Sequence, residues 1–465
     1  MTALAAGTAR ADLPQRTGWP AKMAPGISGK YLLSPFCGVA LADLDRDNKL
    51  EVIGSSGDRV WVWDAAGKAR AGWPVNVKGT AQAPPAVGDL DGDGDLEIVQ
   101  VARGLKYSDT THVHALHHDG KPVSGWPFVS STLIYRAPSL ADLDGNGALD
   151  VVLQISRWKQ PGTVTVLSGD GSQLGTWRHD TDGLPVAASA VGDLNGDGCL
   201  DVAYITATRL YARACDGAAL AGFPRQADSG RSYKGGVVIA DLAPGRPGRE
   251  LITLDLQDGA TATARVLALG ADGKPVPGFP ATAGTGAAGL VGPTVGDVDG
   301  DGALEVVLGV RGAGIVVMGP DGKQEGKTIA TLADTQAAVH LIDVDGDGAL
   351  ELLADNNTAK DGKGYLEAYR ADGGAAAGFP LRPPGSTMVN NASVADLDGD
   401  GVLELSIAST LNQAKPESWV SLWGLPKAKP AKHQWATYAH DVRRSGCLGC
   451  AAASTKVWKG DAGPD

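Results

Sequence analysis

The sequence predicts an all-β protein, an eight-bladed β-propeller in which four-stranded antiparallel blades form a closed ring. Two observations lead to this prediction. An acidic loop, with glycines in all but its first copy, recurs eight times along the 465 residues, at steps of 46 to 56 residues. Between the loops, short runs rich in valine, isoleucine and leucine alternate with turn residues. A regular period of about 50 residues with four strands per unit is typical of propeller blades.

The elements of each unit follow in a fixed order. A short apolar strand, such as 86–88, leads into the acidic loop, and a longer strand, such as 150–155, follows it. A third strand, such as 163–167, leads in most units to an Asp-Gly turn like Asp119-Gly120, which favours a hairpin. The fourth strand often carries a Gly-aromatic-Pro motif. Because proline cannot donate to a strand ladder, we expect this strand at the outer rim, with the aromatic ring packed between blades.

The two ends of the chain complement each other. Gly18-Trp19-Pro20 is a fourth-strand motif with no three strands before it, and the last unit, 388–423, has no such motif after it. We therefore expect the N-terminal strand to complete the last blade and close the ring. The chain then divides into residues 1–15, a signal remnant or disordered N-terminus, the propeller at 16–427, and a tail at 428–465 that packs on the propeller and ends in disorder.

The acidic loop is best preserved at 89–97, Asp-Leu-Asp-Gly-Asp-Gly-Asp-Leu-Glu. Acidic side chains stand at positions 1, 3, 5 and 9, and the glycines at positions 4 and 6 allow tight turns. Carboxylates this close repel one another unless a cation lies among them, and calcium accepts six to eight oxygen ligands in flexible geometry. An EF-hand is excluded, because that loop needs a glutamate at position 12, where this copy has Gln100, and a helix on each side.

Seven intact copies predict about seven calcium ions, each held by the side chains of positions 1, 3, 5 and 9 and the carbonyl of position 7. The copy at 241–250 keeps only its two ends, and Arg246 and Arg249 place positive charge where the cation would be, so we assign it no metal. The expected ligands are Asp43, Asp45, Asp47, Lys49, Glu51; Asp89, Asp91, Asp93, Asp95, Glu97; Asp142, Asp144, Asn146, Ala148, Asp150; Asp193, Asn195, Asp197, Cys199, Asp201; Asp297, Asp299, Asp301, Ala303, Glu305; Asp343, Asp345, Asp347, Ala349, Glu351; and Asp396, Asp398, Asp400, Val402, Glu404.

The net charge of −12 is explained by these loops. The seven intact copies hold 26 carboxylates at positions 1, 3, 5 and 9, and seven calcium ions would change the net charge from −12 to +2. The acidity is therefore mostly metal ligand. No basic stripe indicates a nucleic-acid partner, and no apolar run is long enough for membrane insertion. We expect a monomer.

The cysteines and the N-terminus bear on location. Cys199 and Cys215 flank a strand pair and should lie at the same end of it, which is compatible with a disulfide. A single Cys447-x-x-Cys450 is poor evidence for zinc, and the pairing of the five cysteines, Cys37 included, stays open. Ala9-Arg10-Ala11 resembles the end of a secretory signal. Together these features favour a secreted, periplasmic or cell-surface protein.

The loops resemble the calcium loops of FG-GAP or VCBS repeats, which occur in the integrin α-subunit propeller and in many secreted bacterial proteins. The resemblance covers about residues 16 to 427, and the tail segment 435–446 is similar to the closing segment of bacterial members. It implies a calcium-binding extracellular propeller with roles such as cell adhesion or carbohydrate binding. The repeated loop is specific for fold and metal but says little about function.

Two functional classes follow. The sequence contains no Gly-x-Ser-x-Gly, His-Glu-x-x-His or phosphate-binding glycine loop, so we assign no catalytic residue. The first hypothesis is a non-catalytic binding or adhesion module for an anionic polysaccharide or a protein surface. The alternative, by resemblance to some rhamnogalacturonan lyases, is a polysaccharide lyase acting on an acidic glycan, with Tyr107, Tyr135 or Tyr233 as the base beside Arg136.

The expected ligand site lies on the face opposite the acidic loops, where units two to five carry basic and aromatic residues. Guanidinium groups can hold carboxylates in a bidentate manner, and aromatic rings can stack on sugars. Arg136 and Arg231 precede first strands, so we expect them to point toward the mouth of the central channel. The expected ligand-binding residues are Tyr107, Tyr135, Arg136, Trp158, Arg231 and Tyr233.

Overall fold

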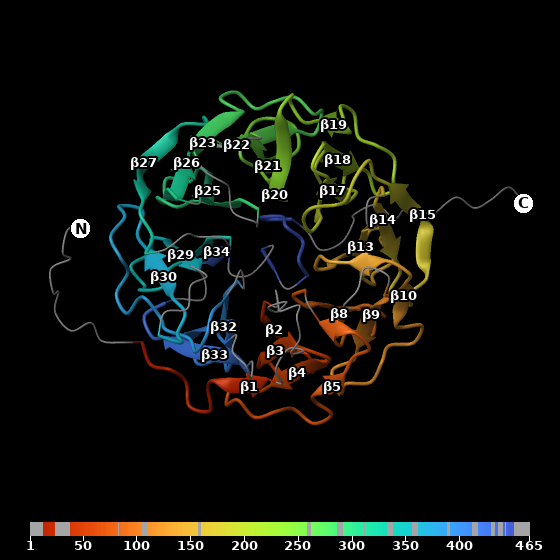
Figure 1. Cartoon of the computed structure of the whole chain (residues 1–465), viewed down its shortest axis with the longest axis vertical. Coiled ribbons are helices and arrows are strands. Elements are labelled where there is room, and N and C mark those ends of the chain that lie inside the picture. Colours follow the sequence, from red (N-terminus) through yellow and green to blue (C-terminus); the bar gives the residue numbers. More distant parts are fainter. Residues whose placement is uncertain are drawn as a thin grey trace, which may run out of the picture.

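The computed structural model describes residues 13–23, 38–81, 83–104, 109–156, 160–257, 262–285, 292–310, 312–332, 338–355, 361–387, 391–411, 417–428, 433–435, 440–441 and 443–450. Within these residues, 34 strands form eight antiparallel sheets that stand as blades around a central axis (Figure 1). No helix of the length and hydropathy that a membrane crossing requires is found in the described part of the chain. The predicted eight-bladed β-propeller is confirmed.

Blades 1 to 4 are numbered along the chain, and each runs from a short inner strand to the rim. Blades 2 and 3 each contain one extra strand of two residues: β6 pairs with β8 in blade 2, and β11 pairs with β13 in blade 3. Their strands are, for blade 1, β2 (Ala40–Ala42), β3 (Glu51–Ser56), β4 (Arg59–Trp63) and β5 (Val75–Asn76); for blade 2, β6 (Thr80–Ala81), β7 (Ala86–Gly88), β8 (Glu97–Arg103), β9 (Thr111–Leu116) and β10 (Phe128–Ser130); for blade 3, β11 (Leu133–Ile134), β12 (Ser139–Ala141), β13 (Asp150–Ser156), β14 (Thr163–Leu167) and β15 (Gln173–Asp180); and for blade 4, β16 (Ala190–Gly192), β17 (Asp201–Ile205), β18 (Arg209–Arg213) and β19 (Arg225–Gln226).

Blades 5 to 8 complete the ring, and blades 7 and 8 each include a strand from one end of the chain. Their strands are, for blade 5, β20 (Arg231–Ala240), β21 (Glu250–Gln257), β22 (Thr263–Gly270) and β23 (Ala281–Thr285); for blade 6, β24 (Thr294–Gly296), β25 (Glu305–Val310), β26 (Gly314–Met318) and β27 (Gln324–Ile329); for blade 7, β28 (His340–Ile342), β29 (Glu351–Asp355), β30 (Leu366–Tyr369) and β34 (His433–Trp435); and for blade 8, β31 (Ser393–Ala395), β32 (Leu403–Leu411), β33 (Glu417–Leu425) and β1 (Ala21–Met23).

The core lies between neighbouring blades. The second strands β8 and β13 are buried along their whole length, because another blade covers each of their faces. Strands covered on both faces read as nearly continuous apolar runs, whereas the rim strand β15 has mostly exposed residues. One apolar cluster joins Ile53 of blade 1 to Ile98 of blade 2, and the next joins Val99 of blade 2 to Leu153 of blade 3.

The N-terminal strand closes the ring, as predicted. β1 pairs antiparallel with β33, with Ala21 opposite Val420 and Met23 opposite Ser418. Ahead of β1, the Arg16 N–H donates to the Leu422 carbonyl at 3.0 Å. Blade 8 is therefore built from the two ends of the propeller segment.

The described residues of the C-terminal tail lie inside the ring, where β34 pairs with the innermost strand of blade 7 (Figure 1). Farther along the tail, backbone carbonyls accept hydrogen bonds from the inner strands of blades 3, 4 and 5: Arg443 from Leu140, Ser445 from Val191, and Gly446 from Ile239. This position inside the channel was not predicted. Blade 7 also lacks the rim strand that its Gly-Phe-Pro motif indicates, and Leu381 there forms only an isolated bridge with Leu366.

The tryptophans of the Gly-aromatic-Pro motifs in blades 1 and 2 join each of these blades to the next. The Trp73 Nε1–H donates to the His118 carbonyl of blade 2 at 3.0 Å, and the Trp126 Nε1–H donates to the Gly169 carbonyl of blade 3 at 2.7 Å. The expected packing of these rings between blades is therefore present. The pairing of the cysteines, which the sequence left open, is Cys199 with Cys215, with 5.8 Å between the two Cα atoms, and Cys447 with Cys450 in the tail.

Candidate functional site

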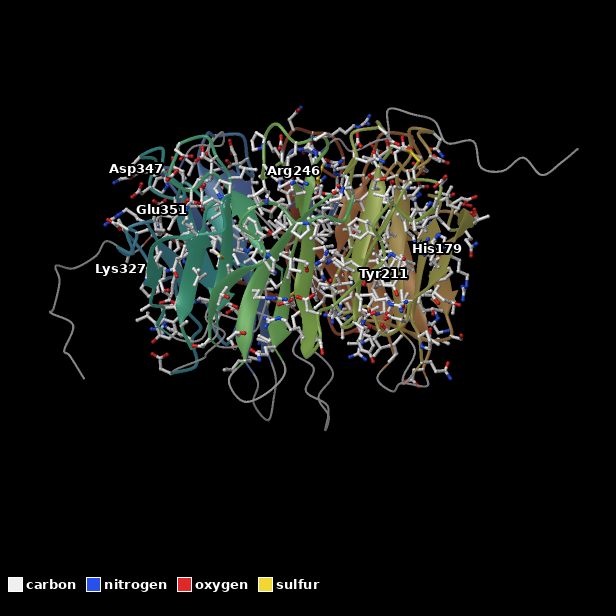
Figure 2. All side chains as sticks on the ribbon, turned by 90° about the horizontal axis from the view of Figure 1, so that it is seen from above. His179, Tyr211, Arg246, Lys327, Asp347 and Glu351 are labelled. Carbon is white, nitrogen blue, oxygen red and sulfur yellow. A yellow bond between two sulfur atoms is a disulfide. The ribbon has the colours of Figure 1, made fainter. Side chains whose placement is uncertain are left out.

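The acidic loops gather on one face of the ring, because each connects the first strand of a blade to the second. Figure 2 shows Asp347 of blade 7 and Arg246 of blade 5 near the same face. In blade order the loops are loop 1 (43–51), loop 2 (89–97), loop 3 (142–150), loop 4 (193–201), loop 5 (241–250), loop 6 (297–305), loop 7 (343–351) and loop 8 (396–404).

Hydrogen bonds within each loop aim the side chains inward. In loop 3, the Asp142 carboxylate accepts the N–H groups of Asn146 and Gly147 at 3.0 and 2.9 Å, and the Asn146 side chain accepts the Ala148 N–H at 2.8 Å. As a result, one oxygen each of Asp142, Asp144 and Asp150 lie within 4.8 Å of one another. The sequence predicted this convergence from the spacing alone.

In each intact loop the carboxylate at position 9 lies buried at the bottom of the loop. Burial, followed by the charges of the neighbouring loop carboxylates, raises the pKa of Glu351 to about 7 and that of Asp150 to about 8. One Glu351 oxygen accepts the Val344 N–H at 2.8 Å, whereas its Oε1 is buried without a hydrogen-bond partner, as is Oδ1 of Asp201. An unpartnered buried carboxylate oxygen is costly unless a cation lies beside it. These donors therefore fit a hard cation such as calcium.

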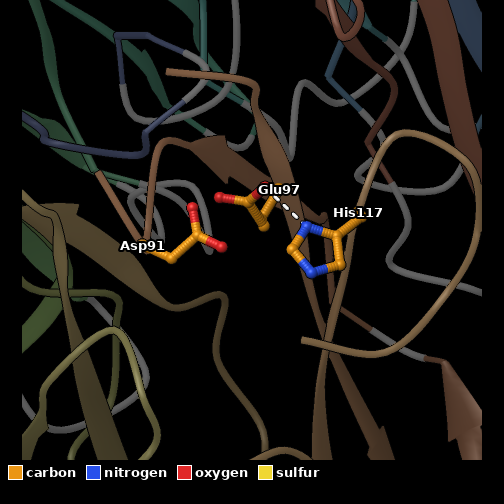
Figure 3. A group of neighbouring side chains, drawn as sticks. All are labelled: Asp91, Glu97 and His117. Atoms are coloured by element: carbon orange, nitrogen blue, oxygen red, sulfur yellow. Dashed lines mark hydrogen bonds and ion pairs between the residues drawn. The ribbon is translucent and has the colours of Figure 1, made fainter. Parts of the chain in front are cut away.

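A histidine joins the carboxylates of loop 2 (Figure 3). His117 Nδ1 lies 3.1 Å from Oε1 of the buried Glu97, and Asp91 completes a group whose ligand atoms lie within 4.8 Å of one another. His117 directly follows the third strand of its blade, so the hairpin brings it beside the loop. We did not predict this contact, although the position after β9 could have indicated it.

Arginines enter loops 1 and 8. Arg70 forms an ion pair with Asp45, and its Nη1 lies 3.0 Å from Oε1 of Glu51. In loop 8, Arg16 Nη2 lies 2.5 Å from Asp398 Oδ2, and Arg16 Nη1 lies 3.3 Å from Glu404 Oε1. The sequence analysis missed both contacts. The available signal was that each arginine stands two residues before a Gly-Trp-Pro motif.

Loop 5 also contains an arginine beside its buried acid, in agreement with the charge expected there. Arg246 Nε lies 3.7 Å from Oε1 of Glu250. Arg249 behaves differently, because its Nη2 donates to the Gly449 carbonyl of the tail at 2.9 Å. One of the two arginines therefore faces the loop, and the other ties the loop to the tail.

The expected ligand-binding residues fall into three groups. Tyr107 and Trp158 lie outside the described residues. Tyr135 and Arg136 are half-buried, and the Arg103 guanidinium lies 4.9 Å from the centre of the Tyr135 ring.

The last two residues, Arg231 and Tyr233, belong to the interior of blade 5. Arg231 Nε lies 2.6 Å from Asp255 Oδ1, and Arg231 Nη2 donates to the Thr263 carbonyl at 2.7 Å. Tyr233 is fully buried, and this burial raises its pKa to about 12, which makes it a poor base. Of the four described residues, Tyr135 and Arg136 are thus half-buried, whereas Arg231 and Tyr233 are held inside blade 5.

Comparisons with known proteins agree with this architecture. A family model for FG-GAP-like repeats matches residues 43–99 and 297–354. No curated protein sequence matches the chain. Among solved structures, the biofilm matrix protein Bap1 of V. cholerae is similar with a TM-score of 0.53 and 14% identity, over 94% of this chain and 99% of that chain. Sqt1 of Saccharomyces cerevisiae is similar with a TM-score of 0.52 and 11% identity, over 88% of this chain and 99% of that one. The chain is an eight-bladed β-propeller that carries FG-GAP-like repeats.

Proposed function

We propose that this protein is a non-catalytic, calcium-stabilised binding or adhesion module that works outside the cell interior. The observation that carries the proposal is the set of acidic loops on one face, with a buried carboxylate at the base of each. The similar matrix protein Bap1 is compatible with an adhesive role. In this proposal calcium neutralises the loops and fixes the turn between the first and second strands, while the opposite face is free for a partner.

The two disulfides support the proposed location. Cys199–Cys215 joins loop 4, just before β17, to the turn after β18, and Cys447–Cys450 lies in the tail. Disulfides persist in oxidising compartments and are rare where thiols are kept reduced. This chemistry supports a secreted, periplasmic or cell-surface location.

The proposed partner is an anionic polysaccharide or an acidic protein surface, bound near Arg136 and Tyr135. β11, just before these residues, pairs Leu133 with Ser156, at the end of β13 remote from loop 3. The pair therefore belongs to the half of the blade that faces away from the acidic loops. A guanidinium can hold a carboxylate there in a bidentate manner, and the tyrosine ring adds an apolar surface.

A glycan array probed at millimolar calcium tests the binding proposal. We expect binding to acidic glycans that weakens with added salt, and a loss of about tenfold in affinity for Arg136→Ala, the usual effect of removing one charged hydrogen-bonding group. Lys121→Ala removes a positive charge from the turn beside loop 2 and is the control. Equal affinity of Arg136→Ala and the parent protein would refute this site. Absorbance of an unsaturated uronide after incubation with the same glycans would contradict the non-catalytic assignment.

A further inference from the structure

We infer that Arg70 and Arg16 are built-in cations that take the place of calcium in loops 1 and 8, so that the protein binds calcium in loops 2, 3, 4, 6 and 7 only. This inference rests on the proposed calcium binding and changes its stoichiometry from about seven to five. Loops 1 and 8 then adjoin each other at the seam of the ring, where blade 8 meets blade 1, and loop 5 is the third loop without metal.

The arginine contacts involve the oxygens that calcium would need. Arg70 pairs with positions 3 and 9 of loop 1, and its Nη1 lies 3.9 Å from Asp47 at position 5. The same three positions of loop 8 face Arg16, with Asp400 at position 5 lying 3.8 Å from Nη1. A guanidinium carries a permanent positive charge, so it neutralises the carboxylates of the cage without metal.

The two arginines occupy the same position in their blades. The Arg70 N–H donates to the Val62 carbonyl, and the Arg16 N–H donates to the Leu422 carbonyl. In both cases the acceptor stands one residue before a tryptophan that forms a bridge with the residue preceding the arginine. The equivalent backbone bond in blades 2, 4, 5 and 7 is made by the apolar residues Val123, Leu220, Val276 and Ala376. The loops of blades 2, 4 and 7 therefore receive no cation from this position.

Blade 6 shows the opposite substitution. Glu325 pairs with Val317 in the register that Arg70 and Arg16 have in their own blades. It therefore brings a further carboxylate toward loop 6, which already holds Asp297, Asp299 and Glu305 together. A loop with an extra acid at this position has a greater need for a metal ion than a loop with an arginine.

Loop 1 departs from the metal-binding pattern in a second way. Arg46 and Asn48 replace the glycines at positions 4 and 6, and both have a left-handed backbone, with φ of 59° and 66°. The seam is also tied by a direct bond, because the Leu50 N–H of loop 1 donates to the Leu397 carbonyl of loop 8 at 2.8 Å. Because an arginine instead of an ion neutralises each of the two loops that meet here, the contact between blades 8 and 1 should not depend on the calcium concentration.

The test counts calcium ions per chain by elemental analysis at saturation and by titration calorimetry. We expect five for the parent protein and six for Arg70→Val, since valine is the residue at this position in blades 2 and 5. Arg16→Val should also give six, the double variant seven, and Glu325→Arg four. Arg59→Val, which removes a surface arginine of the same blade, is the control and should give five.

The outcomes separate the two proposals. A parent protein that binds no calcium would refute the proposed function. A parent count of six or seven, or an Arg70→Val count equal to that of the parent, would overturn the assignment of arginine as the cation. Because the parent count needs no substitution, the inference stays testable even if one variant does not fold.

Discussion

At the scale of single residues, the Gly-aromatic-Pro motif meets two demands at the joint between blades. Gly72 has a left-handed backbone, with φ of 88°, and a Cβ atom added there would overlap the Asp119 carbonyl oxygen of the next blade. The neighbouring Trp73 donates its Nε1–H to His118 in the same turn. The glycine therefore permits a close approach that the tryptophan then fixes by a hydrogen bond.

The close approach predicts a large cost for Gly72→Ala. We expect the free energy of unfolding to fall by more than about 2 kcal/mol, because a left-handed alanine costs about 1 to 2 kcal/mol before any clash is added. Gly326→Ala is the control, since Gly326 is also left-handed, with φ of 57°, but a Cβ there meets nothing within 4 Å. Denaturant unfolding measures both, and equal losses would show that the contact with Asp119 is unimportant.

The hydrogen bond predicts a smaller effect for Trp126→Phe. We expect a loss of about 1 kcal/mol beyond the change in ring size, because the Gly169 carbonyl would lose its donor in a buried joint. Trp61→Phe is the matched control, because the Trp61 Nε1 has no hydrogen-bond partner to lose. If the two variants unfold at the same denaturant concentration, the bond to Gly169 does not stabilise the ring.

At the scale of elements, the two ends of the chain act on opposite edges of the blades. β1 covers the outer edge of β33, and the tail covers inner edges, with Arg444 fully buried among the carbonyls of Val39 and Pro85. Through these bonds and those to blades 3, 4, 5 and 7, the tail touches six of the eight blades. It therefore resists the separation of blades from within the channel.

Truncation tests this role of the tail. A chain ending at Ala428 should melt at a lower temperature than the parent, because the N–H groups of Leu140, Val191 and Ile239 would lose their acceptors. A chain ending at Cys450 keeps all of these bonds and is the control. A chain ending at Ala428 that melts at the parent temperature would show that the tail adds nothing to the ring.

The sequence predicted the elements that repeat and missed those that depend on a single long-range contact. The loop spacing and the lone Gly18-Trp19-Pro20 motif indicated the eight blades and the closing strand, because each signal recurs or has a counterpart elsewhere in the chain. Arg16 lies 382 residues from Asp398, and its place two residues before Gly-Trp-Pro does not by itself identify that partner. The path of the tail likewise depends on backbone bonds to several blades, and backbone bonds leave no side-chain pattern.

At the scale of the whole molecule, backbone hydrogen bonds link several of the neighbouring acidic loops. The Leu149 N–H of loop 3 donates to the Asp89 carbonyl of loop 2 at 2.9 Å, and the Arg249 N–H of loop 5 donates to the Leu194 carbonyl of loop 4 at 2.8 Å. Each bond joins one loop to the loop of the preceding blade. A loop that changes shape therefore strains its neighbours, so the loss of calcium should be felt around the ring.

Chelation of calcium should lower the melting temperature of the whole ring in one cooperative transition. Extracellular modules bind calcium with dissociation constants of about 0.1 to 1 mM, and an ion at ten times its dissociation constant stabilises the fold by about 1.4 kcal/mol. If the contributions add, five such sites raise the free energy of unfolding by about 7 kcal/mol. Calorimetry with and without chelator measures the shift.

Magnesium should restore little of the lost stability, because it demands octahedral geometry and releases its water reluctantly. Arg70→Val should widen the gap between the two melting temperatures, because one more loop would then depend on the ion, whereas a parent melting temperature that ignores chelator would contradict a stabilising role for calcium.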